Sequence, residues 1–341
     1  MEFSFTTIHT IDLELEETIK RDVPETFSTF AYNLFDYIDK NKSTRLYREI
    51  SSNTEVISSV LQIASSYSNE IFYEKSETIA NRLLREEIRV QNEVKNMNTK
   101  VRKGSCIQAF SSNSSNFVYL ITKVQHQPFI DDIDLLSKTG FPQEQKGIWK
   151  SCLMFIDKKN MKLEQIKVYS DNIAKYWGDG FLELAPINTD DDNTKNSFKA
   201  IDATINRILK KYPQDKRTLR NNIITYIRNN DLINYDDMVD DCVSRVDTES
   251  VDQKVIDKLR DELQSLPEKK GFDRQFTPIP KSITAKIRKV YQVSQGIELR
   301  VNNVEGNLYE KIVSTQNTAG KKILQIAVDD DATYQEFLPK Q

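Results

Sequence analysis

Three aspartates lie close together in the segment PFIDDIDLL, residues 128–136. They are Asp131, Asp132 and Asp134. A nuclease can bind Mg²⁺ through clustered carboxylates of this kind. Such a site also requires a Glu-x-Lys pair, with both side chains on the same face of a neighbouring strand. Here Glu164 and Lys167 have two residues between them, so the alternation of a strand places their side chains on opposite faces. The segment therefore favours a solvated loop, and a metal-dependent nuclease stays an alternative.

Other residue types that carry catalysis are sparse in this chain. The two histidines, His9 and His126, have no Cys or His at metal-ligand spacing. The three cysteines, Cys106, Cys152 and Cys242, form no CxxC pair, which gives neither a disulfide framework nor a zinc ribbon. Glycine-rich phosphate loops and the GxSxG motif are absent from the sequence. We therefore expect no enzyme, no catalytic residue, no cofactor and no metal.

Charge in the C-terminal half is arranged in three blocks, although the whole chain has a net charge of only -3. Residues 207–228 carry seven Lys or Arg and one acidic residue. Residues 266–290 carry seven Lys or Arg and two acidic residues. Between them, residues 231–263 carry eleven acids and four bases. Two basic blocks on one face would contact phosphates, with strong salt dependence. Alternatively, the acidic and basic helices pair with each other, within one chain or across a dimer.

The basic blocks supply the main candidates for contacts with nucleic acid. Spacings of three residues, as in Arg217 and Arg220 or Lys286 and Lys289, place side chains together on one face of a helix. The candidates are Lys210, Lys211, Lys216, Arg217, Arg220, Lys281, Lys286, Arg288 and Lys289. Whether the acidic block 231–263 mimics DNA or regulates its binding is left open.

A second candidate surface is the stretch KTGFPQEQKGIWKSCLMFID, residues 138–157. Trp149 lies between Lys146 and Lys150, just before an apolar run. An indole between two lysines is a stacking platform for a nucleic-acid base. The plainer interpretation is a Trp that covers the edge of a core, with lysines that keep this edge soluble.

Hydrophobic periodicity predicts an α+β protein. The length of 341 residues allows two domains, and we place them at 1–190 and 191–341, with the boundary in the DDNTKN tract. The first domain combines helices near residues 24–38, 54–66 and 70–97 with an antiparallel sheet. Its strands are an alternating run at 3–15 and the hairpins 106–124 and 151–170.

The second domain is predicted to be helical and closed by a small antiparallel sheet. Helices are expected over residues 194–212, 213–228 and 234–245, and Ser250 with Gln253 forms a capping-box pattern for a fourth. Residues 280–292 are predicted as a short basic helix, and three strands follow it.

Several segments, taken in order, resemble the bacterial nucleoid-associated protein family of the NdpA/YejK type. They are FVYLITKVQHQPFID, TGFPQEQKGIWKSCLMFID, AKYWGDGFLELAPINTDDDNTKNSFKAI and QFTPIPKSITAKIRKVY, with the strands after them. The resemblance covers residues 105–330 and contains no catalytic motif. It implies a protein that is found with the bacterial chromosome and binds DNA without strong sequence choice. The family offers no catalytic residues to carry over.

These observations together predict a non-catalytic, nucleoid-associated protein that binds double-stranded DNA mainly through the phosphate backbone. No stretch reaches the roughly 18 apolar residues of a membrane span. The N-terminus lacks the basic and apolar regions of a signal peptide, so we expect a cytoplasmic protein without membrane contact. The opposed charge blocks suggest a homodimer. The alternatives are a protein-interaction or phage-defence component that docks a partner through its charged helices, and the nuclease.

Overall fold

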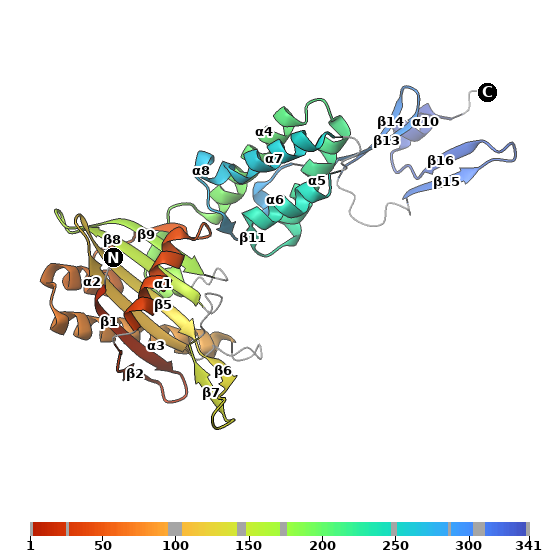
Figure 1. Cartoon of the computed structure of the whole chain (residues 1–341). Coiled ribbons are helices and arrows are strands. Elements are labelled where there is room, and N and C mark those ends of the chain that lie inside the picture. The colour runs from red at the N-terminus through yellow and green to blue at the C-terminus, as the bar shows by residue number, and fades with distance from the viewer. Residues whose placement is uncertain are drawn as a thin grey trace. The chain divides into compact units, whose positions relative to one another are not determined.

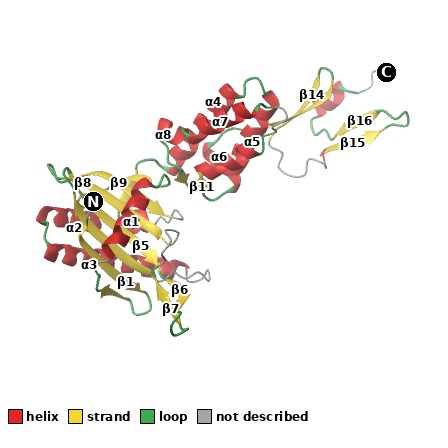
Figure 2. Cartoon of the chain, viewed as in Figure 1, coloured by secondary structure: helices red, strands yellow, loops and turns green. Residues whose placement is uncertain are grey.

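The computed structural model describes residues 3–24, 27–94, 104–141, 148–170, 176–246, 251–285, 288–302 and 311–338. Its internal contacts divide the chain into two units, Met1–Ile283 and Thr284–Gln341. A large antiparallel sheet, helices and small two-stranded sheets confirm the predicted α+β class (Figure 2). The domain boundary expected at residue 190 coincides with the start of a helix inside the first unit and stays a prediction.

An eight-stranded antiparallel sheet forms the first part of unit Met1–Ile283, with the strand order β10-β3-β9-β8-β5-β4-β1-β2 (Figure 1). Its strands are β1 (Phe3–Asp12), β2 (Glu17–Arg21), β3 (Arg45–Glu49), β4 (Gly104–Ser112), β5 (Asn116–Gln125), β8 (Ile148–Asp157), β9 (Lys162–Ser170) and β10 (Leu184–Pro186). The predicted hairpins β4–β5 and β8–β9 are confirmed. The alternating run at 3–15 is a strand as far as Asp12, where β1 ends. Asp12 accepts hydrogen bonds from the backbone N–H groups of Glu14 and Leu15, and the chain turns there into β2.

Helices cover both faces of this sheet (Figure 1). On one face, α1 (Phe27–Lys40) buries Leu34 and Ile38 in a cluster with Ile107 and Leu120 of the central strands. On the other face, α2 (Glu55–Ser66) and α3 (Asn69–Val94) pack against the alternate residues of the same strands, such as Cys106 and Phe110. Because helices cover both faces, almost every residue of β4 and β5 is buried, polar ones such as Gln108 included. The helices predicted near 24–38, 54–66 and 70–97 are confirmed where the structure describes them, and residues 25–26 and 95–97 lie outside the described residues.

Two smaller elements complete the sheet region. Strands β6 (Gln127–Ile130) and β7 (Ser137–Gly140) form a hairpin that contains the segment with the three aspartates. A π-helix covers Tyr176–Phe181, and Arg82 on α3 donates hydrogen bonds to the carbonyl groups of Gly180 and Phe181.

The rest of the first unit is helical. Its helices are α4 (Asp190–Ile208), α5 (Pro213–Asn229), α6 (Tyr235–Ser244), α7 (Gln253–Gln264) and α8 (Leu266–Lys270). The short strand β11 (Ile233–Asn234), between α5 and α6, pairs with β12 (Gln275–Phe276), which follows α8. Helix α4 packs against α5, α7 and α8. Thr189 caps α4, because its hydroxyl accepts a hydrogen bond from the backbone N–H of Asp192. The N-cap of α7 is Asp252, and the predicted cap, Ser250, lies outside the described residues.

In the second unit, the described residues form two hairpins and a short helix. Strand β13 (Arg288–Ser294) pairs with β14 (Ile297–Asn302), β15 (Ile312–Gln316) pairs with β16 (Lys322–Ile326), and α10 (Asp331–Glu336) follows. The predicted basic helix over 280–292 is therefore wrong: Pro280–Ser282 is a single 3-10 turn and the chain is a strand from Arg288. Val290, Tyr291 and Val293 favour that strand, and Gly296 makes its turn with a positive φ.

Among the helices that the structure describes, none combines the length and the apolar character needed to cross a bilayer.

Candidate nucleic-acid interface

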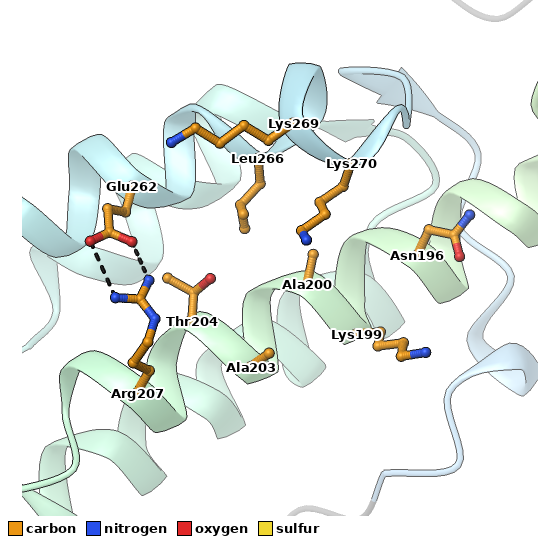
Figure 3. A pocket seen from close by; sticks show the side chains of 10 residues that line it. All are labelled: Asn196, Lys199, Ala200, Ala203, Thr204, Arg207, Glu262, Leu266, Lys269 and Lys270. Carbon is orange, nitrogen blue, oxygen red and sulfur yellow. Dashed lines mark hydrogen bonds and ion pairs between the residues drawn. The ribbon is translucent and has the colours of Figure 1, made fainter.

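A groove of about 720 Å³ lies between α4 on one side and α7 with α8 on the other (Figure 3). It is lined by Asn196, Lys199, Ala200, Ala203, Thr204, Arg207, Glu262, Leu266, Lys269 and Lys270. Its lining thus contains four basic side chains and one acidic side chain. Ala200, Ala203 and Leu266 supply its apolar part.

The α4 wall follows from helical periodicity. Lys199, Ala203 and Arg207 recur at intervals of four residues and therefore share one face of the helix. The alanines at 200 and 203 are small, which leaves the space between the helices open. Lys199 and Arg207 are both exposed, so their charged groups meet solvent beside this open space.

A buried arginine holds the opposite wall in place. Arg274 donates hydrogen bonds to both carboxylate oxygens of Glu268 on α8, at 2.7 and 2.8 Å, and to the backbone carbonyl of Gln264 at 2.8 Å. It also pairs with Asp236 on α6. Gly271 ends α8 with φ 69°, in the left-handed region that favours glycine. Lys269 and Lys270 are thereby fixed at the last turn of α8, where both side chains are exposed.

The acidic residue in the groove is neutralised by an arginine. Arg207 donates two hydrogen bonds to Glu262, one of them from Nη1 to Oε1 at 3.4 Å (Figure 3). These bonds hold the pKa of Glu262 below its ordinary value, and the charges of Lys258 and Lys269 act in the same direction. Within the described ranges, Lys199, Lys269 and Lys270 form no ion pair, so the groove keeps an excess of positive charge.

Arg45 on β3 fixes both walls at their sheet end. Its guanidinium contacts Asp190, the first residue of α4, at 3.1 Å, and Asp273, which follows α8, at 3.1 Å. Asn193 on α4 donates a hydrogen bond to Asp273 at 2.8 Å and accepts one from its backbone N–H at 2.8 Å. The start of α4 and the segment after α8 are therefore joined through one polar network.

The first predicted basic block is divided between different flanks of α4. Lys210 and Lys211 are exposed directly after the end of α4, three and four residues beyond Arg207 of the groove. Lys216 and Arg217 lie half-buried near the start of α5. Arg220 pairs with Asp202 at 2.7 Å and lies over the ring of Phe198, at 5.7 Å from its centroid. Helical spacing puts Phe198 and Asp202 on another flank than Lys199 and Arg207.

The second predicted block is described only in part. Lys281 is exposed in the 3-10 turn of the first unit, and Lys286 lies outside the described residues. Arg288 and Lys289 belong to β13 of the second unit. Because Lys289 is in a strand, the helical spacing that linked it to Lys286 does not apply. The single basic face remains a prediction.

The stretch around Trp149 gives little support for the predicted contacts with nucleic acid. Lys146 lies outside the described residues, as does the side chain of Trp149, whose backbone belongs to β8. Lys150 is buried, with 9% of its surface exposed, and its Nζ lies 5.2 Å from the ring centroid of Tyr176. Burial argues against Lys150 as a contact for phosphate.

The three aspartates form part of a hairpin turn. Lys138 on β7 pairs with both Asp131 and Asp134 at 2.8 Å, and Asp131 also accepts a hydrogen bond from the backbone N–H of Ile133 at 3.0 Å. The bond from Lys138 lowers the pKa of both carboxyl groups. No group of three His, Cys, Asp or Glu in the described part of the chain could hold a metal ion.

The proposed partners of that aspartate cluster are also engaged elsewhere. Glu164 accepts a hydrogen bond from Asn116 at 3.0 Å, and Lys167 pairs with Asp39 at 2.6 Å. This geometry gives the nuclease alternative no support.

The acidic block partly pairs with its basic neighbours, as one interpretation of the charge pattern expects. Arg207 with Glu262 links it to the first basic block, and Arg274 with Asp236 links it to the second. The lysines of the groove are left out of this pairing.

Charge counting alone did not find the groove. Arg207, Lys269 and Lys270 lie within the basic blocks but are not among the predicted site residues, and Lys199 lies outside the blocks. The four-residue spacing of Lys199, Ala203 and Arg207 was the available signal.

Comparison with models of protein families gave no match to this chain, and comparison with curated proteins gave none.

Proposed function

We propose that the protein binds double-stranded DNA without catalysis, mainly through the phosphate backbone, and that the groove between α4 and α8 is the centre of its interface. The observation that carries this proposal is the groove itself: Lys199, Lys269 and Lys270 are among its lining residues, and Glu262 in the same lining is already paired with Arg207. Lys210 and Lys211 extend the basic surface past the end of α4.

Lysines on two neighbouring helices suit a polyanion better than a small neutral ligand. Each lysine that meets a phosphate displaces condensed counterions, so the binding constant falls with salt. Phosphate contacts position a protein on a duplex but carry no base sequence, which fits weak sequence preference. The resemblance to nucleoid-associated proteins adds to the proposal a place on the bacterial chromosome, and the opposed charge blocks add a homodimer.

The test is a fluorescence-anisotropy titration of a labelled duplex with the wild type and the variant Lys199→Glu/Lys269→Glu/Lys270→Glu. We expect this variant to lose at least about tenfold in affinity at low salt, because three phosphate contacts become repulsive. The matched control is Lys42→Glu/Lys159→Glu/Lys162→Glu, which changes the same charge at exposed positions outside the groove. An equal loss in both variants would show that only net charge matters.

A second candidate function is that of a protein-interaction component. It is favoured by the β6–β7 hairpin, which exposes Ile133 to 90% and Leu135 to 74% of their surfaces. Lys138 and the turn around Asp131 hold these apolar residues outward. The partner we propose for this hairpin is a second copy of the chain. The groove of that copy is basic and partly apolar, and it therefore complements the acidic, apolar β6–β7 hairpin.

Light scattering at micromolar concentration tests this candidate. A dimer mass for the wild type that becomes a monomer mass for Ile133→Ser/Leu135→Ser would support it. A monomer mass for both proteins would contradict it.

A further inference from the structure

The groove contains an anion of its own. Among the described residues that line it, Glu262 is the acidic one, and both of its carboxylate oxygens accept hydrogen bonds from the guanidinium of Arg207 (Figure 3). A guanidinium offers the same two parallel N–H groups to a carboxylate and to a phosphate. The position that Glu262 occupies is therefore one that a phosphate oxygen pair could occupy.

The ion pair is also placed so that it can open. The side chain of Arg207 is 58% exposed and that of Glu262 is 28% exposed. Exposed pairs of this kind contribute little to stability, since water and salt replace the interaction readily. A duplex phosphate can thus displace Glu262 from Arg207 without unfolding either helix.

Displacement of Glu262 has an electrostatic cost for a bound polyanion. The released carboxylate stays in the groove, near Lys258 and Lys269, whose charges already act on it. It would both repel an incoming phosphate and compete for these lysines. Glu262 therefore opposes DNA at the same place where the basic residues attract it.

We propose that Glu262 is an internal competitor: in the unbound protein it occupies the phosphate-binding position of Arg207, and it lowers the affinity of the groove for DNA. This inference rests on the proposed function and adds its regulation. Exchange of a tethered carboxylate for a phosphate keeps binding weak and reversible at the salt concentration of a cell. Arg207 then becomes an additional phosphate contact only after the exchange.

The test compares Glu262→Gln with the wild type in the same titration at several salt concentrations. Gln keeps the size of the side chain and removes its charge. We expect the affinity to rise by about three- to tenfold at low salt, because no carboxylate has to be displaced from Arg207. The salt dependence should stay close to that of the wild type, since Arg207 contacts a phosphate in both complexes. Asp261→Asn is the matched control, because it removes one charge from an exposed position of α7 outside the groove.

A double-mutant cycle with Arg207→Gln separates competition from net charge. In the Arg207→Gln background, Glu262→Gln should raise the affinity no more than Asp261→Asn does. Melting curves by circular dichroism confirm that each variant is folded.

The role of Glu262 as a competitor can be contradicted in several ways. An equal gain from Glu262→Gln and Asp261→Asn would overturn the inference, and so would a loss of affinity in Glu262→Gln, which would show that Glu262 positions Arg207 for binding. If the wild type binds DNA and Glu262→Gln changes nothing, the inference alone fails. If neither protein binds at low salt, the proposed function fails and the inference with it.

Discussion

Arg45 and Asp273 are 228 residues apart in the sequence and form a buried ion pair in which Nε of the arginine lies 3.1 Å from Oδ2 of the aspartate. Both side chains are less than a tenth exposed. Burial raises the pKa of Asp273, and the hydrogen bond from Asn193 and the charge of Arg45 oppose that rise. Because Asp190 shares the same guanidinium, this contact fixes the sheet against the two segments that begin and end the groove.

Loss of the arginine should therefore destabilise the protein strongly. In Arg45→Leu, the carboxylate of Asp273 stays buried without its charge partner, and we expect the free energy of unfolding to fall by about 3–5 kcal/mol. Urea unfolding at pH 7 measures the change. Arg45→Leu/Asp273→Asn should recover part of the loss, because the unpaired charge is gone.

An exposed pair gives the matched comparison for that variant. Arg85 pairs with Glu55 at 2.7 Å, and its side chain is 57% exposed. Arg85→Leu should cost less than about 1 kcal/mol. Equal losses in Arg45→Leu and Arg85→Leu would contradict the role given to burial.

Stability should fall in mild acid because of His9. Burial, and secondly the charge of Lys20, lower the pKa of His9 to about 4 from an ordinary value of 6.5. The unfolded chain takes up a proton below pH 6.5 while the folded protein does not, so stability is lost as the pH falls from about 6.5 towards 4. Between pH 7 and pH 5 this histidine should cost about 1–2 kcal/mol.

The comparison that isolates this histidine is urea unfolding of the wild type and His9→Gln at both pH values. The variant should lose about 1–2 kcal/mol less between pH 7 and pH 5, because glutamine does not titrate. If both proteins lose the same amount, other groups cause the acid sensitivity and His9 does not.

The turn that ends α8 depends on the backbone of Gly271. Its φ of 69° is strained for most L-residues, while a Cβ at this position would meet nothing within 4 Å. Gly271→Ala should therefore lower stability by about 1 kcal/mol through the backbone alone. Gly271→Asn should cost less, since Asn tolerates this conformation. Thermal melting checks the order, and equal melting temperatures for the glycine and alanine forms would contradict it.

Strong, long patterns in the sequence predicted much of the fold. The hairpins β4–β5 and β8–β9 each contain one strongly apolar run, FVYLI in β5 and CLMFI in β8, and α2 and α3 follow a helical stripe. Strands β2, β3 and β10 were missed because they are short and partly polar, as in RLYRE over β3. The helix expected over 280–292 was wrong because lysine spacing outweighed three strand-forming residues, Val290, Tyr291 and Val293.

The sequence predicted the basic regions of the candidate site but not the groove itself. The charge blocks indicated where cations are plentiful, but which of them are paired depends on packing between helices. Arg220 pairs with Asp202, and Arg207 pairs with Glu262. These partners are far apart in the sequence, so local residue spacing does not predict the contacts. The groove also depends on Ala200 and Ala203, which carry no charge signal at all.

The salt dependence of duplex binding tests the central claim most directly. The logarithm of the binding constant should fall linearly with the logarithm of salt concentration, and each phosphate contact adds about 0.9 to the slope. Lys199→Glu/Lys269→Glu/Lys270→Glu should therefore reduce the slope by about 2–3 relative to the wild type, while Lys42→Glu/Lys159→Glu/Lys162→Glu leaves it nearly unchanged. A wild-type slope that the groove variant retains, or no binding by the wild type at low salt, would contradict the groove as a DNA interface.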